Sequence, residues 1–296
     1  MIKNLSAFRQ GVAQTFICNT IWGNLPYFFL LLAGFSPFLI IGYRIIFAFI
    51  TLLVVLIYTG KWRDVLALRN NLKLIGWLCV TALLIGLNWF LFIYAMLTNR
   101  VLDASLGYLI LPLISTLLGG LILKEKFNAY KILAFALAFF AVSIMVFVYG
   151  EIPYLGLSLG LSFSLYGFFR KQIQVSTLIG LSVEVAILVP VGIYLMWEFS
   201  DGTGIPNMGS VYMMLLGPIT VLTLLAYASS IKKLPFSFAG ILFYWNPLLQ
   251  MIGGLVLGET MTPARGIGFS LIWCSLFLFS YGQIRQNKLI TRPVPL

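Results

Sequence analysis

The sequence contains no histidine, and only 9% of its 296 residues are charged. The absence of histidine excludes His-based acid-base catalysis and metal sites built on imidazole. The sequence also lacks the G-x-x-x-x-G-K-[S/T] loop that binds ATP phosphates, and no predicted loop exceeds about fifteen residues, too few for a soluble catalytic domain. We therefore expect no enzymatic activity, no cofactor and no metal site.

Apolar residues make up 61% of the chain, and the mean hydropathy is +1.02. Soluble domains carry about 25% charged residues, so this composition is typical of a protein that crosses the membrane several times. A spanning helix needs about 20 mostly apolar residues. Ten such segments are predicted, at 11–32, 38–58, 74–97, 103–123, 130–148, 152–168, 178–197, 210–229, 236–257 and 265–284. The three cysteines all fall inside these segments, which favours packing roles over disulfides.

The net charge of +11 is distributed unevenly among the loops. One side of the predicted membrane holds most of the basic residues, namely Lys3, Arg9, Lys61, Arg63, Arg69, Lys73, Lys124, Lys126, Lys131, Arg170, Lys171, Lys232, Lys233, Arg285, Lys288 and Arg292. The other side holds Arg100, Asp103, Glu151, Glu198, Asp201, Glu259 and Arg265. By the positive-inside rule both termini are cytoplasmic. The charge is thus a topology signal, and we expect no nucleic-acid partner.

A short pattern, G-G-L-x-L-x-E, occurs at 119–125 and again at 253–259, and a proline precedes each copy, at Pro112 and Pro247. Paired glycines are also common where membrane helices pack, so the pattern alone leaves that alternative open. As a repeat, it divides the chain into halves at 1–148 and 149–296. Each half then has five spans, an odd number, so the second half is inverted in the membrane relative to the first.

Glycine and proline inside predicted spans indicate places where a helix opens and its backbone becomes available to a substrate. The predicted breaks or hinges are Gly23, Pro26, Gly107, Pro112 and Pro247. The predicted substrate-binding residues are Trp22, Asn24, Arg44, Asn88, Trp89, Tyr108, Tyr166, Tyr244, Trp245 and Asn246. Further amides and hydroxyls nearby are Ser105, Thr116, Thr220 and Gln250. The alternative is that these faces only pack helices together. As a set they suit a small, partly apolar organic solute.

Arg44 and Glu184 are the two formally charged side chains well inside the predicted spans. A charge at that depth costs several kcal/mol unless it is paired or hydrated, so each is a functional candidate. Inversion of the halves places them roughly 10 Å apart in depth at 1.5 Å per residue, so a direct ion pair is not required. Arg44 either holds a substrate carboxylate or a neighbouring carbonyl, or extends to the outer interface. Glu184 either carries a coupling proton or accepts structural hydrogen bonds.

Several short sequences occur in an order that resembles the RarD branch of the EamA-type drug/metabolite transporters. They are Ile21–Gly23, Asn88–Ile93, Ala104–Tyr108 with Pro112 and Leu113, Ser162 and Phe163 with Tyr166, Gly167, Arg170 and Lys171, and Glu184 with Pro190. The resemblance covers nearly the whole chain. It implies ten helices in two inverted halves, a bacterial inner-membrane location and export of small metabolites or drugs. Leu111 and Phe243 stand where the branch tends to have amides, which predicts a less polar pocket.

The sequence therefore predicts an all-α polytopic membrane protein that acts as a secondary active transporter. A small organic metabolite or drug would move by alternating access, with membrane lipid and a coupling proton or ion as further partners. A channel-like facilitator and a lipid-handling or scaffold protein remain as alternatives, and the sequence indicates no oligomeric state.

Overall fold

The computed structural model describes residues 5–123, 129–148, 150–200, 208–231, 233–234 and 242–290, and within these ranges the chain forms helices without strands. The long helices are α1 (Leu5–Gly23), α3 (Pro37–Tyr58), α5 (Leu72–Leu97), α6 (Val101–Leu123), α7 (Ala129–Phe147), α8 (Tyr154–Gln172), α9 (Thr177–Glu198), α10 (Met208–Ile231), α12 (Trp245–Val256) and α13 (Pro263–Ile290). Short helices α2 (Leu25–Phe29) and α4 (Trp62–Ala67) and the 3-10 turns η1 (Leu30–Leu32) and η2 (Leu68–Asn70) connect some of them.

Each long helix overlaps one of the ten predicted spans, although the segments differ in detail. Among the described residues, seven helical stretches are long and apolar enough to cross a membrane: Ser6–Leu32, Pro37–Tyr58, Leu72–Leu97, Ala129–Phe147, Thr177–Glu198, Met208–Ser230 and Pro263–Gly282. Large apolar side chains lie exposed on outer faces, with Leu83, Phe139 and Phe277 at 66%, 75% and 70% exposure. Such faces are suited to lipid, so the chain is a multi-pass helical membrane protein.

Some predicted positions lie outside the described part of the chain. The side chains of Thr116 and of the first motif copy, 119–125, are among them, as are 236–241 of the ninth predicted span.

The cysteines are free, and Cys274 is exposed rather than packed, whereas Cys18 is buried.

The first predicted span is not one helix. α1 ends at Gly23 and α2 begins at Leu25, because Pro26 suits the first turn of a new helix and removes a backbone donor from an old one. α6, by contrast, runs continuously through Gly107 and Pro112. Gly107 instead allows α8 to approach α6 closely, because a Cβ added at Gly107 would lie 2.4 Å from the backbone oxygen of Gly156. α6 and α8 therefore touch backbone to backbone.

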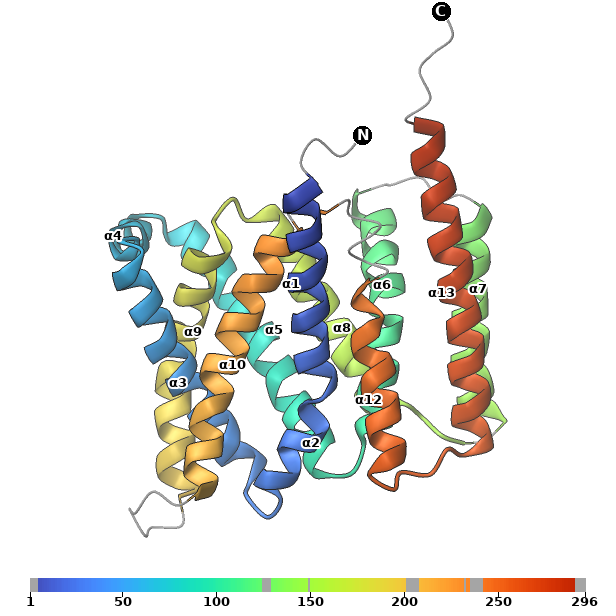
Figure 1. The fold of residues 1–296 in the computed structure, drawn as a ribbon, viewed down its shortest axis with the longest axis horizontal. Helices are drawn as coiled ribbons and strands as arrows, with labels where there is room; N and C mark the ends of the chain where they lie inside the picture. Colours follow the sequence, from blue (N-terminus) through green and yellow to red (C-terminus); the bar gives the residue numbers. More distant parts are fainter. Residues whose placement is uncertain are drawn as a thin grey trace, which may run out of the picture.

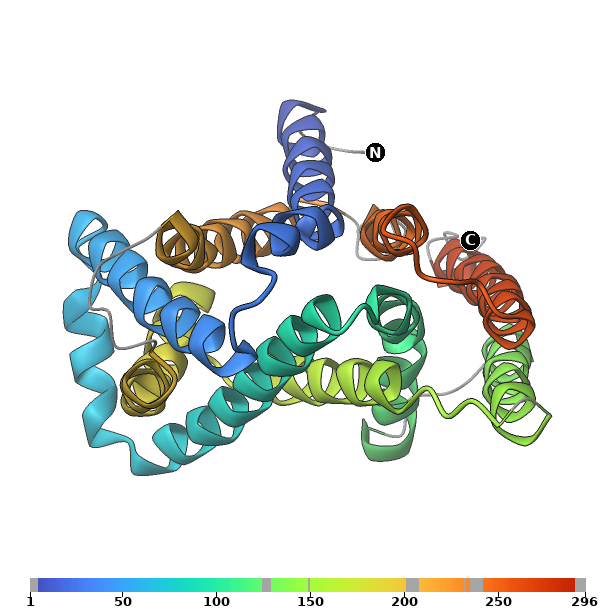
Figure 2. The ribbon, with the colours of Figure 1, turned by 90° about the horizontal axis from the view of Figure 1, so that it is seen from below.

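The helices run up and down through the bundle, and the start of α1, helix α4 and the end of α13 lie at one end (Figure 1). The turns that follow α5, α7 and α12 lie at the opposite end. Seen along the helices, α10, α1 and α12 form one row that faces α5 and α8, with α3 and α9 beyond one side and α7 and α13 beyond the other (Figure 2). The cavity described below lies between these rows.

Ion pairs at the end opposite α4 join the two halves of the sequence. Asp103 is 4% exposed and pairs with Arg100 at 2.6 Å and with Arg265 at 3.4 Å, while Arg265 also reaches Glu151 at 3.8 Å. Glu259 accepts hydrogen bonds from the backbone amides of Val101 and Leu102 at the start of α6. A carboxylate at this position compensates the positive end of the helix.

The most extensive helix contacts in the described part of the chain all join a helix of residues 1–148 to one of residues 149–296. They are α7 with α13, α6 with α8, α3 with α9, α3 with α10, α5 with α8, α6 with α12, α1 with α10 and α1 with α12. The two halves of the sequence are therefore interleaved, and neither forms a separate bundle.

Candidate functional site

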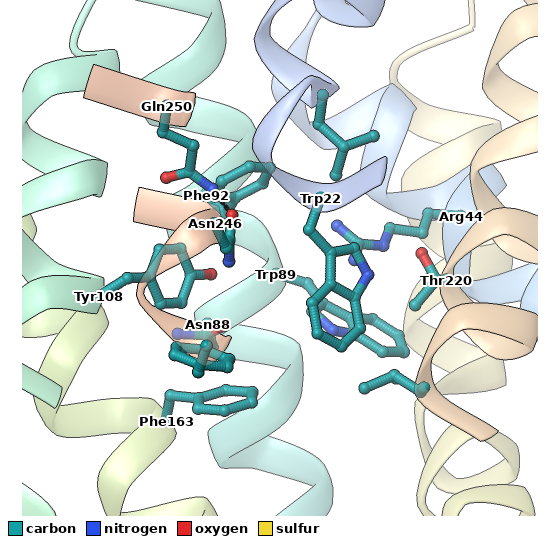
Figure 3. Close-up of a pocket in the computed structure, with 13 residues that line it drawn as sticks. Trp22, Arg44, Asn88, Trp89, Phe92, Tyr108, Phe163, Thr220, Asn246 and Gln250 are labelled. Atoms are coloured by element: carbon teal, nitrogen blue, oxygen red, sulfur yellow. Dashed lines mark hydrogen bonds between the residues drawn. The ribbon is translucent and has the colours of Figure 1, made fainter. Parts of the chain in front are cut away.

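A cavity lies between the helix rows, and both halves of the chain line it (Figure 3). Its lining consists of Trp22, Leu25, Arg44, Asn88, Trp89, Phe92, Tyr108, Phe163, Thr220, Leu224, Phe243, Asn246 and Gln250. Six of these thirteen residues are aromatic and two are leucines, and the polar side chains are few. This combination of apolar surface with a small number of placed polar atoms is typical of sites for small organic ligands.

Helix α5 supplies three lining residues because Asn88, Trp89 and Phe92 fall on one face at helical spacing. The Asn88 amide donates hydrogen bonds to the Leu159 carbonyl and the Ser162 hydroxyl of α8, both at 3.1 Å. These bonds hold α5 against α8 and orient Asn88 at the wall of the cavity.

Arg44 and the tryptophans form one side of the cavity. The Arg44 guanidinium lies 4.6 Å from the centre of the Trp89 ring, and the side chain is only 7% exposed. Trp22 donates from Nε1 to the Thr223 hydroxyl at 2.8 Å and packs edge-on against Tyr227 at 5.4 Å. Contacts with α10 thus fix the Trp22 ring, and the contact with Arg44 fixes the Trp89 ring.

The other side of the cavity carries Tyr108, Asn246 and Gln250 (Figure 3). Asn246 and Gln250 lie one turn apart on α12, and Gln250 Nε2 donates to Asn246 Oδ1 at 2.9 Å. Tyr108 packs between Phe92 and Phe163, with ring centres 6.0 and 6.3 Å away.

A second polar cluster surrounds Glu184, which is fully buried. Thr81 donates to Glu184 Oε1 at 2.7 Å, Tyr166 donates to Oε2 at 3.1 Å, and Arg170 Nε lies 3.5 Å from Oε1. Tyr166 also packs 5.8 Å from Phe163, a residue of the cavity wall. One layer of rings therefore separates this cluster from the cavity.

Six of the ten predicted binding residues line the cavity, namely Trp22, Arg44, Asn88, Trp89, Tyr108 and Asn246. The other four lie elsewhere: Asn24 is exposed and bonds to Thr20, Tyr166 bonds to Glu184, Tyr244 packs on Trp273, and Trp245 stacks on Phe16 and bonds to Thr20. The break at Gly23 explains the divergence on α1, because Asn24 begins the turn into α2 and points away from the wall.

Several residues of both clusters were not among the predicted site residues. Phe92 and Leu224 lie one turn after Asn88 and Thr220, so helical spacing could have identified them. Arg170 was assigned to a basic loop, but α8 extends to Gln172 and carries it to Glu184. A signal for this contact was Gly180, whose missing side chain leaves space that the Arg170 guanidinium occupies.

These features define a class: a multi-pass helical membrane protein with an internal cavity, rich in aromatic residues, whose lining offers one cation, three amides and two hydroxyls. Comparison with known proteins identifies the family. The model of the EamA-like transporter family matches residues 9–147. The chain is 34% identical to the uncharacterized transporter YojE of Bacillus subtilis over 95% of this chain and 96% of that protein. It is 32% identical to the protein RarD of Escherichia coli K12, over 95% and 98% respectively.

The chain therefore belongs to the RarD branch of the EamA-type drug/metabolite transporters. A solved crystal structure shares its fold, with a TM-score of 0.61 at 15% identity, over 90% of this chain and 96% of the other.

Proposed function

We propose that this protein is a secondary active transporter that exports a small organic solute across the bacterial inner membrane by alternating access. The observation that carries the proposal is the cavity between the helix rows, walled by both halves of a chain that belongs to a transporter family. Its rings and amides suit an organic molecule better than a bare ion, because ion sites use rings of charge or carbonyl oxygens.

Inverted repeats are part of this proposal, and the helix contacts support them. If α1 corresponds to α8, α3 to α9, α5 to α10, α6 to α12 and α7 to α13, contacts come in matched sets. The α6–α8 contact corresponds to α12–α1, the α5–α8 contact to α10–α1, and the α3–α10 contact to α9–α5. Corresponding helices also run in opposite directions through the bundle (Figure 1). Two halves related in this way can exchange conformations, so the cavity between them opens alternately to either side of the membrane.

The interleaved contacts indicate what moves. Each moving group would combine helices of both halves, because the largest interfaces lie between the halves rather than within them. The ion pair of Asp103 with Arg265 ties α6 to α13 at the end opposite α4. Opening at that end would have to separate Arg265 from Asp103.

Glu184 remains our candidate for the coupling proton. Its partners are Thr81 of α5 and Tyr166 and Arg170 of α8, and Arg170 is the cation that would have to move away before Glu184 binds a proton. A pairing that alternates between Arg170 and a proton would couple the solute cycle to the proton gradient. Replacing Glu184 with Gln should then abolish pH-driven transport but spare solute exchange; unchanged pH dependence would remove Glu184 from this role.

Transport through the cavity can be tested with two tryptophan variants of one helix. Leu224 lines the cavity, whereas Leu222 is 56% exposed on the outer face of α10. Proteoliposomes would be loaded with a mixture of amino acids, nucleosides, aromatic acids and amphenicols, and solute release would be measured by mass spectrometry. Leu224→Trp should block release and Leu222→Trp should not. Release faster than a carrier cycle allows would indicate a channel, and no release by the wild type would favour a lipid-handling or scaffold role.

A further inference from the structure

Arg44 is the formally charged member of the cavity wall, and no described residue balances it. It makes neither a hydrogen bond nor an ion pair with any described residue, and its Nε is buried without an acceptor. Glu184 cannot serve, since Arg170, Thr81 and Tyr166 already occupy it. The Trp89 ring compensates only part of the cost of a buried guanidinium. An anion in the cavity would supply the missing partner.

A second unpartnered polar atom lies across the cavity. Gln250 is 1% exposed, its Nε2 donates to Asn246, and its Oε1 is buried without a donor. A buried acceptor without a donor is costly, so this oxygen also calls for a ligand group, and that group must carry an N–H or O–H. Arg44 reaches in from one side and Gln250 from the other, and the rings of Trp22 and Trp89 lie beside the Arg44 guanidinium (Figure 3).

We infer that the transported solute is a planar aromatic carboxylate whose carboxylate binds Arg44 and whose opposite end donates a hydrogen bond to Gln250. This inference rests on the proposed function and names its substrate class. The planar guanidinium matches a carboxylate with two donors, and the flat indole rings match a flat ring. The arrangement selects against protonated amines, because a second cation would face Arg44 in a cavity whose wall offers no carboxylate.

Three matched probes separate the two requirements. 4-Aminobenzoate has a carboxylate and a donor at opposite ends of one ring, 4-aminobenzamide lacks the charge, and benzoate lacks the donor. Calorimetric titration of the detergent-purified full chain should show binding of 4-aminobenzoate. The affinity should fall about tenfold or more for 4-aminobenzamide, as expected for loss of a charge-assisted hydrogen bond, and by less for benzoate.

The decisive variant is Arg44→Gln, and the sequence offers a matched control. Arg63 also lies over a tryptophan, 5.3 Å from the Trp62 ring, but it is exposed on α4 and outside the cavity. Arg44→Gln should lose about tenfold or more in affinity for 4-aminobenzoate and lose the preference over 4-aminobenzamide. Arg63→Gln should bind as the wild type does. Arg44→Lys, which keeps the charge, should retain the preference.

Ligand-free stability provides a readout that does not depend on the probes. Because Arg44 is unbalanced in the empty cavity, Arg44→Gln should unfold at or above the wild-type temperature. The inference is overturned if 4-aminobenzamide binds as tightly as 4-aminobenzoate, if Arg44→Gln keeps the preference, or if none of the probes binds. Release of only neutral or cationic solutes from the proteoliposomes would also overturn it while leaving the transporter intact.

Discussion

Replacing Gly107 with alanine should force α6 and α8 apart. The added Cβ would lie 2.4 Å from the Gly156 carbonyl oxygen, and ordinary van der Waals contacts begin at 3.4 Å, so the backbones must separate by the difference, about 1 Å. Neither atom can move by rotation of a side chain, because the backbone fixes the position of the Cβ and the Gly156 oxygen is itself a backbone atom. Overpacking of this kind costs about 1–3 kcal/mol. The midpoint of thermal unfolding should fall by roughly 3–8 °C.

The control for this prediction is Gly167→Ala, on the same helix as Gly156. A Cβ at Gly167 meets no atom within 4 Å, so this variant should unfold at or slightly above the wild-type temperature. Gly156→Ala should behave like Gly107→Ala, because its Cβ would lie 2.5 Å from the backbone oxygen of Asp103. The double variant should lose less than the sum, because one separation relieves both contacts. Equal midpoints for Gly107→Ala and Gly167→Ala would refute the backbone contact.

Three further predictions concern charges and rings. Glu184→Gln should cost about 3 kcal/mol by leaving Arg170 unpaired, and adding Arg170→Gln should recover part of it in a detergent-unfolding series; an additive double variant would contradict the pairing. A transported solute should alter intrinsic fluorescence, and Trp89→Phe should reduce that change while Trp245→Phe, outside the cavity, should not; the reverse pattern would move the site. Burial raises the pKa of Glu259, so its contribution to stability is present below about pH 4 and lost as pH rises through the raised value. The unfolding temperature of the wild type relative to Glu259→Gln should therefore fall with pH, and a rise would contradict this.

Hydropathy and spacing predicted the helices and many of the cavity residues because both signals are local. An apolar run of about 20 residues indicates a helix whatever its neighbours are. Asn88 and Trp89 of α5 are adjacent in the sequence, and both line the cavity. The family was recognisable from short local motifs, and similarity to a relative extends over 95% of the chain.

Contacts between distant segments could not be predicted in this way. The partner of Glu184 is Arg170, fourteen residues away by number but on another helix, and its choice depends on how α8 and α9 cross. Tyr244 and Trp245 follow a segment outside the described residues, and the turn before α12 directs them away from the cavity. Gly107 was expected to open a helix, whereas it permits a neighbouring helix to approach.

The interleaving of the two halves has a consequence for biosynthesis. Helices α1 to α7 are made first, yet their most extensive contacts are with α8 to α13. At about 5–20 residues per second, the first half would wait roughly ten seconds or more for its partners. During that interval Arg44 and Asn88 have no cavity around them and must be tolerated by lipid or by the insertion machinery. Insertion and assembly are therefore separate events for this chain, and its binding site forms only once translation is nearly complete.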